Sequence, residues 1–476
     1  MGAALTIGEK KRMVKKRRLV MHRSRQSTDM TQGCIWKQLL LFALPLLVGQ
    51  IFQQLYNTID SVVVGRYVGK EALAAVGATG NVVNALINFF SGLATGAGVV
   101  ISQYFGARDQ KKVHDAVHTA VAMTLLMAVI CTAVGMLISY KALEWMDTPE
   151  DVVGHAAAYL QIYFAGVSGL MLYNIGSGIL RAVGDSRRPL YFLIFSACLN
   201  LALDLVFVCA LGMGVEGVAY ATIIAQFLSA LLTFFVLCRS QECYRFSLRD
   251  LKLDWSMLRQ ILKLGIPTGL QLGITALSNV FVQSYINAFQ SSCMAGWTSY
   301  NRLDAFAWLP MLALGMANTT FVGQNLGAGQ LERAKKGTRT ALLMSLAGTA
   351  AIVLPLMLFS DAALRLFNDD PEVLRYGHDF VRYISLFDIP YCLTQIYSGA
   401  LRGAGDSVRP MVICLSSFVV FRQIYLFVGT RFIDSHIFVG LSYPMGWVLS
   451  STAMYIVYKR GTWEKKLKIA PVETTV

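Results

Sequence analysis

Long apolar runs alternate with short polar, base-rich segments along the chain from residue 38 onward. Most of these runs hold about 20 apolar residues, the length that crosses the hydrocarbon core of a bilayer as an α-helix. Backbone polar groups in lipid must be hydrogen-bonded internally, so each run predicts a helix; the strand alternation of a membrane β-barrel is absent from the sequence. The twelve predicted helices span residues 38–64, 72–100, 114–140, 155–180, 189–210, 215–238, 256–286, 292–320, 337–360, 376–401, 410–430 and 436–458.

The composition also indicates an integral membrane protein. Of the 476 residues, 55% are hydrophobic and only 15% are charged, whereas soluble domains carry about 25% charged residues. The net charge of +14 could indicate a nucleic-acid partner. The lysines and arginines sit in short loops, however, as cytoplasmic loops of membrane proteins require. We therefore expect a lipid bilayer around the protein and no nucleic-acid partner.

The cysteines and histidines predict no metal site. The nine cysteines include no Cys-x-x-Cys pair, and most fall in or beside apolar runs, which is typical of small apolar packing residues. His114 and His118 are four residues apart, but no His-Glu-x-x-His motif surrounds them. We expect no metal, no cofactor and no catalytic cluster, and hence a protein that is not an enzyme.

Basic residues mark one side of the predicted membrane. A basic arm, residues 1–37, precedes the first helix, and the loop after each even-numbered helix carries lysine or arginine. Two loops on the opposite side are acidic, at residues 144–151 and 369–372. Because basic loops stay in the cytoplasm, this pattern predicts a multi-pass protein with both termini cytoplasmic.

The second half of the chain repeats the first. The stretch from Gly178 to Pro189 returns from Gly399 to Pro410, a shift of 221 residues, with Gly, Leu, Arg, Gly, Asp, Ser, Arg and Pro matching in position. Colinear matches at one offset indicate a duplicated half. Further landmarks return at nearly the same shift: Pro45 as Pro267, Gln103 as Gln324, Gly106 as Gly327, and Ala107 as Ala328.

The duplication predicts the architecture. Each half holds six helices, an even number, so the halves share one orientation and are parallel repeats. We expect an all-α integral membrane protein, with twelve transmembrane helices in two parallel six-helix lobes around a central cavity. The first lobe covers residues 38–238, a cytoplasmic linker 239–255, the second lobe 256–458 and a cytoplasmic tail 459–476.

Polar residues inside the predicted helices distinguish the two halves. A carboxylate within a membrane helix costs about 2.5–3.5 kcal/mol on insertion scales, so Asp60 calls for a role or a polar partner. From its own stretch, Asp60 is either functional or reaches the outer interface beside Arg66. The polar residues lost from the second half are Asp60, Asn200 and Asp204, whose counterparts are Val282, Phe421 and Tyr425.

The fifth helix favours a functional site. Asn200 and Asp204 are four residues apart and therefore share a helix face. Asp204 lies about 22 Å from the inner end of its helix, and Thr222 reaches a similar depth at about 10 Å from the outer end of the next. Two carboxylates, an amide and a hydroxyl at one depth predict a proton or cation site. Sodium would use the same oxygens, so both ions stay open.

Other conspicuous residues have two readings each. Asp304 and Asp388, in the eighth and tenth helices, either line the central cleft or belong to structural ion pairs. Pro45 and Pro267 each remove one helix hydrogen bond, as a hinge or without any such role. The repeated Leu-Arg-x-x-Gly-Asp-Ser loops are interpreted as structural: glycines for tight turns, with Asp185 and Asp406 capping helices.

These residues together resemble the multidrug and toxic compound extrusion (MATE) family, and its bacterial DinF-like branch in particular. The resemblance covers nearly the whole chain after residue 37. It rests on Asp60 followed by Val-Gly-Arg, the two Gly-x-Leu-Arg repeats, Leu-Asn200-Leu-Ala-Leu-Asp204, and Gly323-Gln-Asn-Leu-Gly-Ala-Gly329. It implies a monomeric antiporter of a bacterial plasma membrane that exports organic cations or amphipathic compounds in exchange for protons or sodium.

Site residues follow from the resemblance. It implies a first-lobe ion site at Asp60, Asn200, Asp204 and Thr222, completed by Asn174 or by Ser177. The helix-seven acid of sodium-coupled members falls on Thr275, which argues against a second-lobe site. Cargo would contact apolar cavity faces, among which Phe52, Tyr56, Phe281 and Tyr285 are candidates, although ordinary helix packing explains them equally well.

Two other functions, a flippase and a membrane-embedded enzyme, would require features that the sequence does not show. A lipid-linked precursor flippase of the same superfamily would be expected to have extra helices or a strongly basic cavity, and the sequence shows neither. A membrane-embedded enzyme would need clustered catalytic side chains near the interface, and none is found in the sequence.

Overall fold

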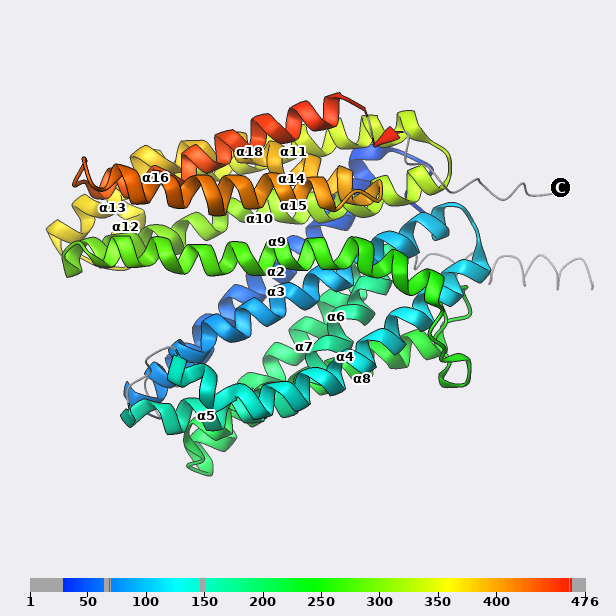
Figure 1. Ribbon diagram of the computed structural model, residues 1–476, viewed down its shortest axis with the longest axis horizontal. Helices are drawn as coiled ribbons and strands as arrows, with labels where there is room; N and C mark the ends of the chain where they lie inside the picture. Colours follow the sequence, from blue (N-terminus) through cyan, green and yellow to red (C-terminus); the bar gives the residue numbers. More distant parts are fainter. Residues whose placement is uncertain (1–28, 64–67, 69, 146–149, 462, 465–476) are drawn as a thin grey trace, which may run out of the picture.

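The computed structural model describes residues 29–63, 68, 70–145, 150–461 and 463–464; side chains within 56–63 and 70–76, and a few others, are outside this description. All regular structure in the described part is helical (Figure 1). The first lobe contains α2 (Ile35–Val63), α3 (Lys70–Gly106), α4 (Gln110–Trp145), α5 (Glu150–Ala165), α6 (Val167–Ala182), α7 (Arg187–Asp204), the π-helical η3 (Leu205–Ala210) and α8 (Gly214–Arg239).

A linker with one short 3-10 turn, η4 (Leu248–Asp250), leads to the second lobe. This lobe contains α9 (Trp255–Asn287), α10 (Ser291–Gly327), α11 (Leu331–Leu358), α12 (Ser360–Arg365), α13 (Pro371–Ile384), η5 (Ser385–Phe387), α14 (Asp388–Gly403), α15 (Val408–Leu415), η6 (Ser416–Phe421), α16 (Arg422–Gly429), α17 (His436–Gly440) and α18 (Ser442–Lys459).

Six crossings per lobe account for these helices, which confirms the predicted fold. Nine described helices are individually long and apolar enough to span a membrane, and α5 with α6 forms a tenth span bent by 48°. The bend falls at Gly166, where a Cβ would lie 2.4 Å from the side chain of Ile223. The remaining two crossings are α13 with α14 and α17 with α18, whose polar residues lower their hydropathy.

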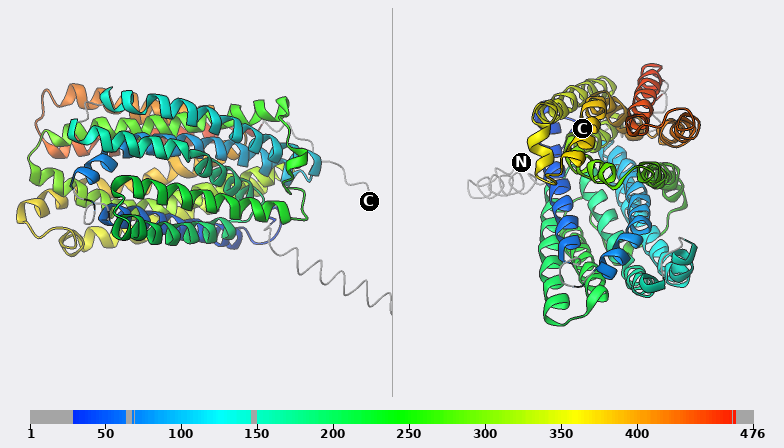
Figure 2. Two further views of the ribbon diagram at one scale, coloured as in Figure 1. Left: turned by 90° about the horizontal axis from the view of Figure 1, so that it is seen from below. Right: turned by 90° about the vertical axis from the view of Figure 1, so that its left-hand side faces the viewer.

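The two lobes converge at the end of the molecule where the described chain begins and ends, and diverge at the opposite end (Figure 1). Seen along the helices, the lobes lie side by side (Figure 2). The loops that follow α3, α6, α10 and α14 all lie at the converging end, and these are basic loops of the sequence pattern.

Glycines allow two helices of different lobes to cross in backbone contact. On α3, a Cβ added to Gly92 would lie 2.3 Å from the backbone of Gly269, and one added to Gly96 would lie 2.4 Å from Gly265. Gly265 and Gly269 belong to α9, with Pro267 between them. Small residues four apart let membrane helices approach this closely, so this crossing is a main joint between the lobes.

Several helices extend further than the sequence predicted. The prediction ended the second and eighth helices near residues 100 and 320, whereas α3 continues to Gly106 and α10 to Gly327. The added turns pack against each other across the lobes. A Cβ on Gly106 would lie 1.9 Å from the carbonyl oxygen of Gln324, and one on Gly327 would lie 1.9 Å from that of Gln103. Burial against the other lobe therefore stabilises turns that hydropathy alone assigns to loops.

Candidate functional site

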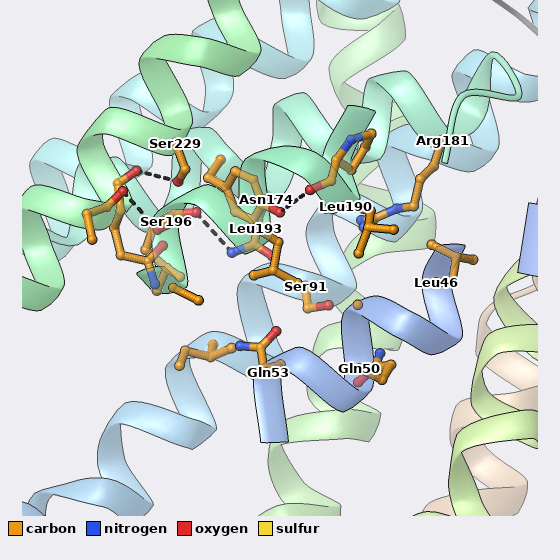
Figure 3. Close-up of a pocket in the computed structure, with 18 of the residues that line it drawn as sticks. Leu46, Gln50, Gln53, Ser91, Asn174, Arg181, Leu190, Leu193, Ser196 and Ser229 are labelled. Atoms are coloured by element: carbon orange, nitrogen blue, oxygen red, sulfur yellow. Dashed lines mark hydrogen bonds between the residues drawn. The ribbon is translucent and has the colours of Figure 1, made fainter. Parts of the chain in front are cut away.

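Two connected cavities lie within the helical bundle. The larger, of about 440 Å³, lies between the lobes and is lined by α2, α3 and α6 on one side and α9, α10 and α14 on the other. The smaller, of about 220 Å³, lies within the first lobe among α2, α6, α7 and α8 (Figure 3). The two cavities share part of their walls, because both are lined by Gln50, Ser91, Arg181 and Met316.

The smaller cavity is lined by two of the polar residues that the sequence predicted to form one site. Asn200 donates a hydrogen bond from Nδ2 to Oγ1 of Thr222 at 3.4 Å, and both residues are buried and line the cavity. Asp204 is buried one turn beyond Asn200 on α7. The structure thus brings Asn200 and Thr222 into contact, with Asp204 one turn away from Asn200.

The uncertain fourth member of the cluster is better matched by Asn174 than by Ser177. Asn174 lines the smaller cavity (Figure 3), and its Nδ2 donates to the carbonyl of Leu170 at 2.9 Å. Asn200 and Thr222 line the same cavity. The side-chain carbonyl oxygen of Asn174 stays available as a ligand. Ser177 is buried and lines neither cavity.

Asp60 and Tyr56 both belong to α2, which packs along α7, but their side chains lie outside the described residues. Their predicted roles therefore stay predictions. Pro45, further along α2, lines the smaller cavity, and Pro267 lies at the α3–α9 crossing.

The two second-lobe acids form a buried pair and line neither of the two cavities. Asp304 of α10 and Asp388 of α14 lie against each other, next to Tyr300 and Trp308. Among the described residues, no hydrogen bond reaches Oδ1 of Asp304 or either carboxylate oxygen of Asp388. Two adjacent carboxylates at low dielectric cannot both be charged unless a cation joins them.

Three of the aromatic residues predicted to contact cargo line neither of the two cavities. Phe52 is exposed, Phe281 has 62% of its surface exposed, and Tyr285 packs against the second-lobe core. Sequence periodicity could not separate cavity-facing from lipid-facing aromatics, because both environments are apolar. The aromatic residues that do line the central cavity are Trp308, Tyr391 and Phe418.

The repeated loops contain the residues that the sequence analysis underestimated. Their turns are as predicted: Gly184 and Gly405 have φ of 89° and 85°, a conformation that favours glycine. Asp185 accepts a hydrogen bond from the backbone N of Arg187 at 3.1 Å and so caps α7. The arginine of each repeat, however, faces inward: Arg181 and Arg402 line the central cavity. The sequence signal that could have indicated these cavity arginines was the repetition of Leu-Arg at the same position in both halves.

A pair of glutamines joins the lobes beneath these arginines. Gln103 donates from Nε2 to the carbonyl of Gly403 at 2.8 Å, and Gln324 donates to the carbonyl of Ala182 at 2.8 Å. Each partner carbonyl directly follows a cavity arginine, and each pair maps onto the other at the 221-residue shift. We call this contact, with Gly106 and Gly327, the glutamine seam. The N-terminal segment reinforces it, since the N–H of Met30 donates to Oε1 of Gln324 at 3.0 Å.

One further cluster at the converging end resembles a metal site but serves as an anchor. His114, His118 and Asp250 have potential ligand atoms within 4.8 Å of one another. Both ring nitrogens of His118 already have partners, the carbonyl of His114 at 2.8 Å and the N–H of Ser247 at 3.1 Å. The imidazole thus fixes the inter-lobe linker to α4.

Comparison with known proteins identifies the family. The MatE family model matches residues 45–206 and again 267–428, one match in each lobe. The chain belongs to the MatE family. These are efflux transporters of the multidrug and toxic compound extrusion class, as the resemblance predicted, and the two matches coincide with the internal repeat.

Relatives and solved structures agree with this assignment. The chain is 30% identical to "Probable multidrug resistance protein YpnP" of Bacillus subtilis, covering 92% of this chain and 97% of that protein. It is 24% identical to an "FAD transporter" of Shewanella oneidensis, covering 90% and 95%. A solved structure in the "outward-facing conformation of a multidrug resistance MATE family transporter" is similar in fold, with a TM-score of 0.85, 23% identity and coverage of 92% and 98%.

Proposed function

We propose that the protein is a secondary antiporter that exports amphipathic small molecules in exchange for protons or sodium. The observation that carries this proposal is the buried Asn200–Thr222 pair in a cavity that shares its wall with the central cavity, with the buried Asp204 one turn from Asn200 on α7. An ion bound in the smaller cavity and cargo bound in the larger one would act on the same wall. Coupling needs only that ion and cargo stabilise different states of that wall.

The glutamine seam supplies the gate of this cycle. With both termini in the cytoplasm, as the basic loops predict, the seam closes the cytoplasmic side and the lobes diverge toward the outside. Opening the seam would require both glutamines to release their carbonyls and the lobes to rock about the α3–α9 crossing. Such rocking is how parallel-repeat transporters alternate access. One chain contains both cavities, so we expect a monomer to suffice.

The substitution Asp204→Asn is expected to reduce gradient-driven export at least about tenfold. The amide keeps the shape of the side chain but cannot take up a proton or neutralise a cation. Export of a fluorescent amphipath from proteoliposomes, with a pH gradient and a sodium gradient imposed separately, measures this. Asp361→Asn is the matched control, because Asp361 is exposed and remote from both cavities.

The second-lobe pair is the competing coupling site, favoured by the buried carboxylates of Asp304 and Asp388. If Asp204→Asn retains export and Asp388→Asn abolishes it, coupling belongs to the second lobe. Loss in Asp204→Asn with retention in Asp388→Asn supports the first lobe. The gradient that drives wild-type export identifies the ion.

The flippase alternative gains one observation. The sequence showed no strongly basic cavity, whereas the structure lines the central cavity with two arginines. The names of the relatives include both drug-resistance proteins and an FAD transporter, so family membership alone leaves the charge of the cargo open.

A further inference from the structure

We infer that the central cavity binds an anionic group, a phosphate or a carboxylate on an apolar body, between Arg181 and Arg402. This inference rests on the proposed transport function and names the cargo class of the same cavity. It departs from the organic cations that the family resemblance implies.

The charges around the cavity carry the inference. Arg181 and Arg402 are the two charged residues among the described side chains that line the central cavity, and no described carboxylate lines it. The smaller cavity adds Arg181 again and, within the described part of the chain, no carboxylate. An organic cation entering this space would meet like charge without a described counter-ion, whereas an anion would meet two guanidinium groups.

The arginines are available to a ligand. No salt bridge within the described residues involves Arg181 or Arg402, although the neighbouring Arg188 and Arg409 pair with Asp185 at 3.4 Å and Asp406 at 3.2 Å. The capping acids of the repeats are therefore occupied by other cations. Nε of Arg402 is buried without a hydrogen-bond partner among the described atoms. A guanidinium without an acidic partner can donate two parallel hydrogen bonds to a phosphate or a carboxylate.

The rest of the lining suits the remainder of such a molecule. Neutral amide side chains line the same cavity as the arginines, including Gln50, Asn279 and Gln395, and an amide N–H group can donate to an oxyanion. Trp308, Tyr391 and Phe418 offer an aromatic wall on the second-lobe side.

The position of the arginines links the anion to the gate. Ala182 and Gly403, which directly follow them, are the carbonyl acceptors of the glutamine seam. A ligand that binds both guanidinium groups would therefore contact equivalent positions of the two lobes, each next in sequence to a seam carbonyl. Such a ligand would be loaded when the seam opens and would be exposed to the diverging end when it closes.

The test compares two probes that share one aromatic body and differ in charge, pyrenebutyrate and pyrenebutyltrimethylammonium. Binding to the purified full chain in neutral detergent is followed by pyrene fluorescence. We expect pyrenebutyrate to bind about tenfold more tightly than the cation, and Arg181→Gln and Arg402→Gln each to weaken it about tenfold, the scale of one charged hydrogen bond. Arg181→Lys keeps the charge but loses the bidentate fork, so its affinity for pyrenebutyrate should fall between those of wild type and Arg181→Gln.

The matched control is Arg187→Gln, which removes the same charge from the same loop at an exposed position. It should leave both affinities unchanged, and gel filtration checks that every variant is folded. Equal affinity of wild type for the two probes, or pyrenebutyrate binding that survives in the Arg181→Gln, Arg402→Gln double variant, would overturn the inference. Displacement of pyrenebutyrate by octyl phosphate or octanoate indicates a soluble source of the anion, and displacement by phosphatidic acid a lipid headgroup; failure of all three contradicts the anion site.

The proposed function can fail independently. If pyrenebutyrate binds through the arginines but no ion gradient drives its export, the anion site stands and the antiport proposal falls. If gradients drive export of the cationic probe while the arginine variants are unaffected, antiport stands and the anion site falls.

Discussion

Gly106→Ala and Gly327→Ala are each expected to reduce export to about a tenth of wild type or less. The new Cβ would lie 1.9 Å from the carbonyl oxygen of Gln324 or of Gln103, so the glutamine seam cannot close without moving a helix backbone. Overpacking of this kind costs about 1–3 kcal/mol, and about 1.4 kcal/mol already shifts the population of the closed state tenfold. Export from proteoliposomes measures the loss.

A second readout separates a blocked gate from a misfolded protein. Ser102, next to Gln103 in sequence, is buried and lines the central cavity. In a cysteine-free background, Ser102→Cys should react faster with a membrane-impermeant maleimide when Gly106→Ala is also present. Gly77→Ala, on the same helix, is the matched control, since a Cβ there meets no atom within 4 Å. Normal export by both seam variants would show that the seam does not need to close.

Gly269→Ala is expected to destabilise the protein strongly. A Cβ at this position would lie 2.7 Å from the carbonyl oxygen of Phe89 on α3. The backbones of Gly92 and Gly269 are also in close contact, since a Cβ on Gly92 would lie 2.3 Å from Gly269. Neither contact involves a flexible side chain, so the two lobes must separate or shift, at a cost of about 1–3 kcal/mol. The thermal unfolding midpoint of the detergent-solubilised protein reports the change.

Gly273→Ala provides the comparison one turn further along α9. Its Cβ would lie 3.7 Å from the carbonyl of Ala85, an ordinary van der Waals contact. The unfolding midpoint of this variant should match wild type within error. If Gly269→Ala has the same unfolding midpoint as Gly273→Ala and wild type, the α3–α9 crossing does not stabilise the contact between the lobes.

Much of the fold was predictable because a chain that crosses lipid must pair its backbone polar groups internally, which leaves few structures besides helices. Apolar length, loop charge and the repeat at a shift of 221 residues were enough to predict twelve helices in two parallel lobes. The helix ends at Gly106 and Gly327 were missed, since contacts with the other lobe stabilise them and hydropathy reports only contacts with lipid. The bend at Gly166 was missed for a similar reason: it depends on the close approach to Ile223.

The candidate site was predictable where polarity was unusual. Asn200, Asp204 and Thr222 stand out in apolar helices; all three are buried, and Asn200 and Thr222 are hydrogen-bonded to each other. The sequence could not show which side chains of a helix point into a cavity and which point into the helical core or to the outside. Phe281 faces outward and Asp388 lies in the second-lobe core, although both had been expected at the cavity. Arg181 was assigned to a structural loop because the last turn of a helix and the loop after it look alike in sequence.

The central claim is exchange, and the most direct test follows the ion while cargo moves. Proteoliposomes containing the purified chain and a trapped pH dye are given a gradient of pyrenebutyrate, or of whichever probe is exported, with no ion gradient imposed. The account predicts that cargo movement drives protons in the opposite direction, or sodium when a sodium dye is used, and that Asp204→Asn abolishes this ion movement. Cargo flux with no opposing movement of either ion would contradict antiport and leave a uniporter in its place.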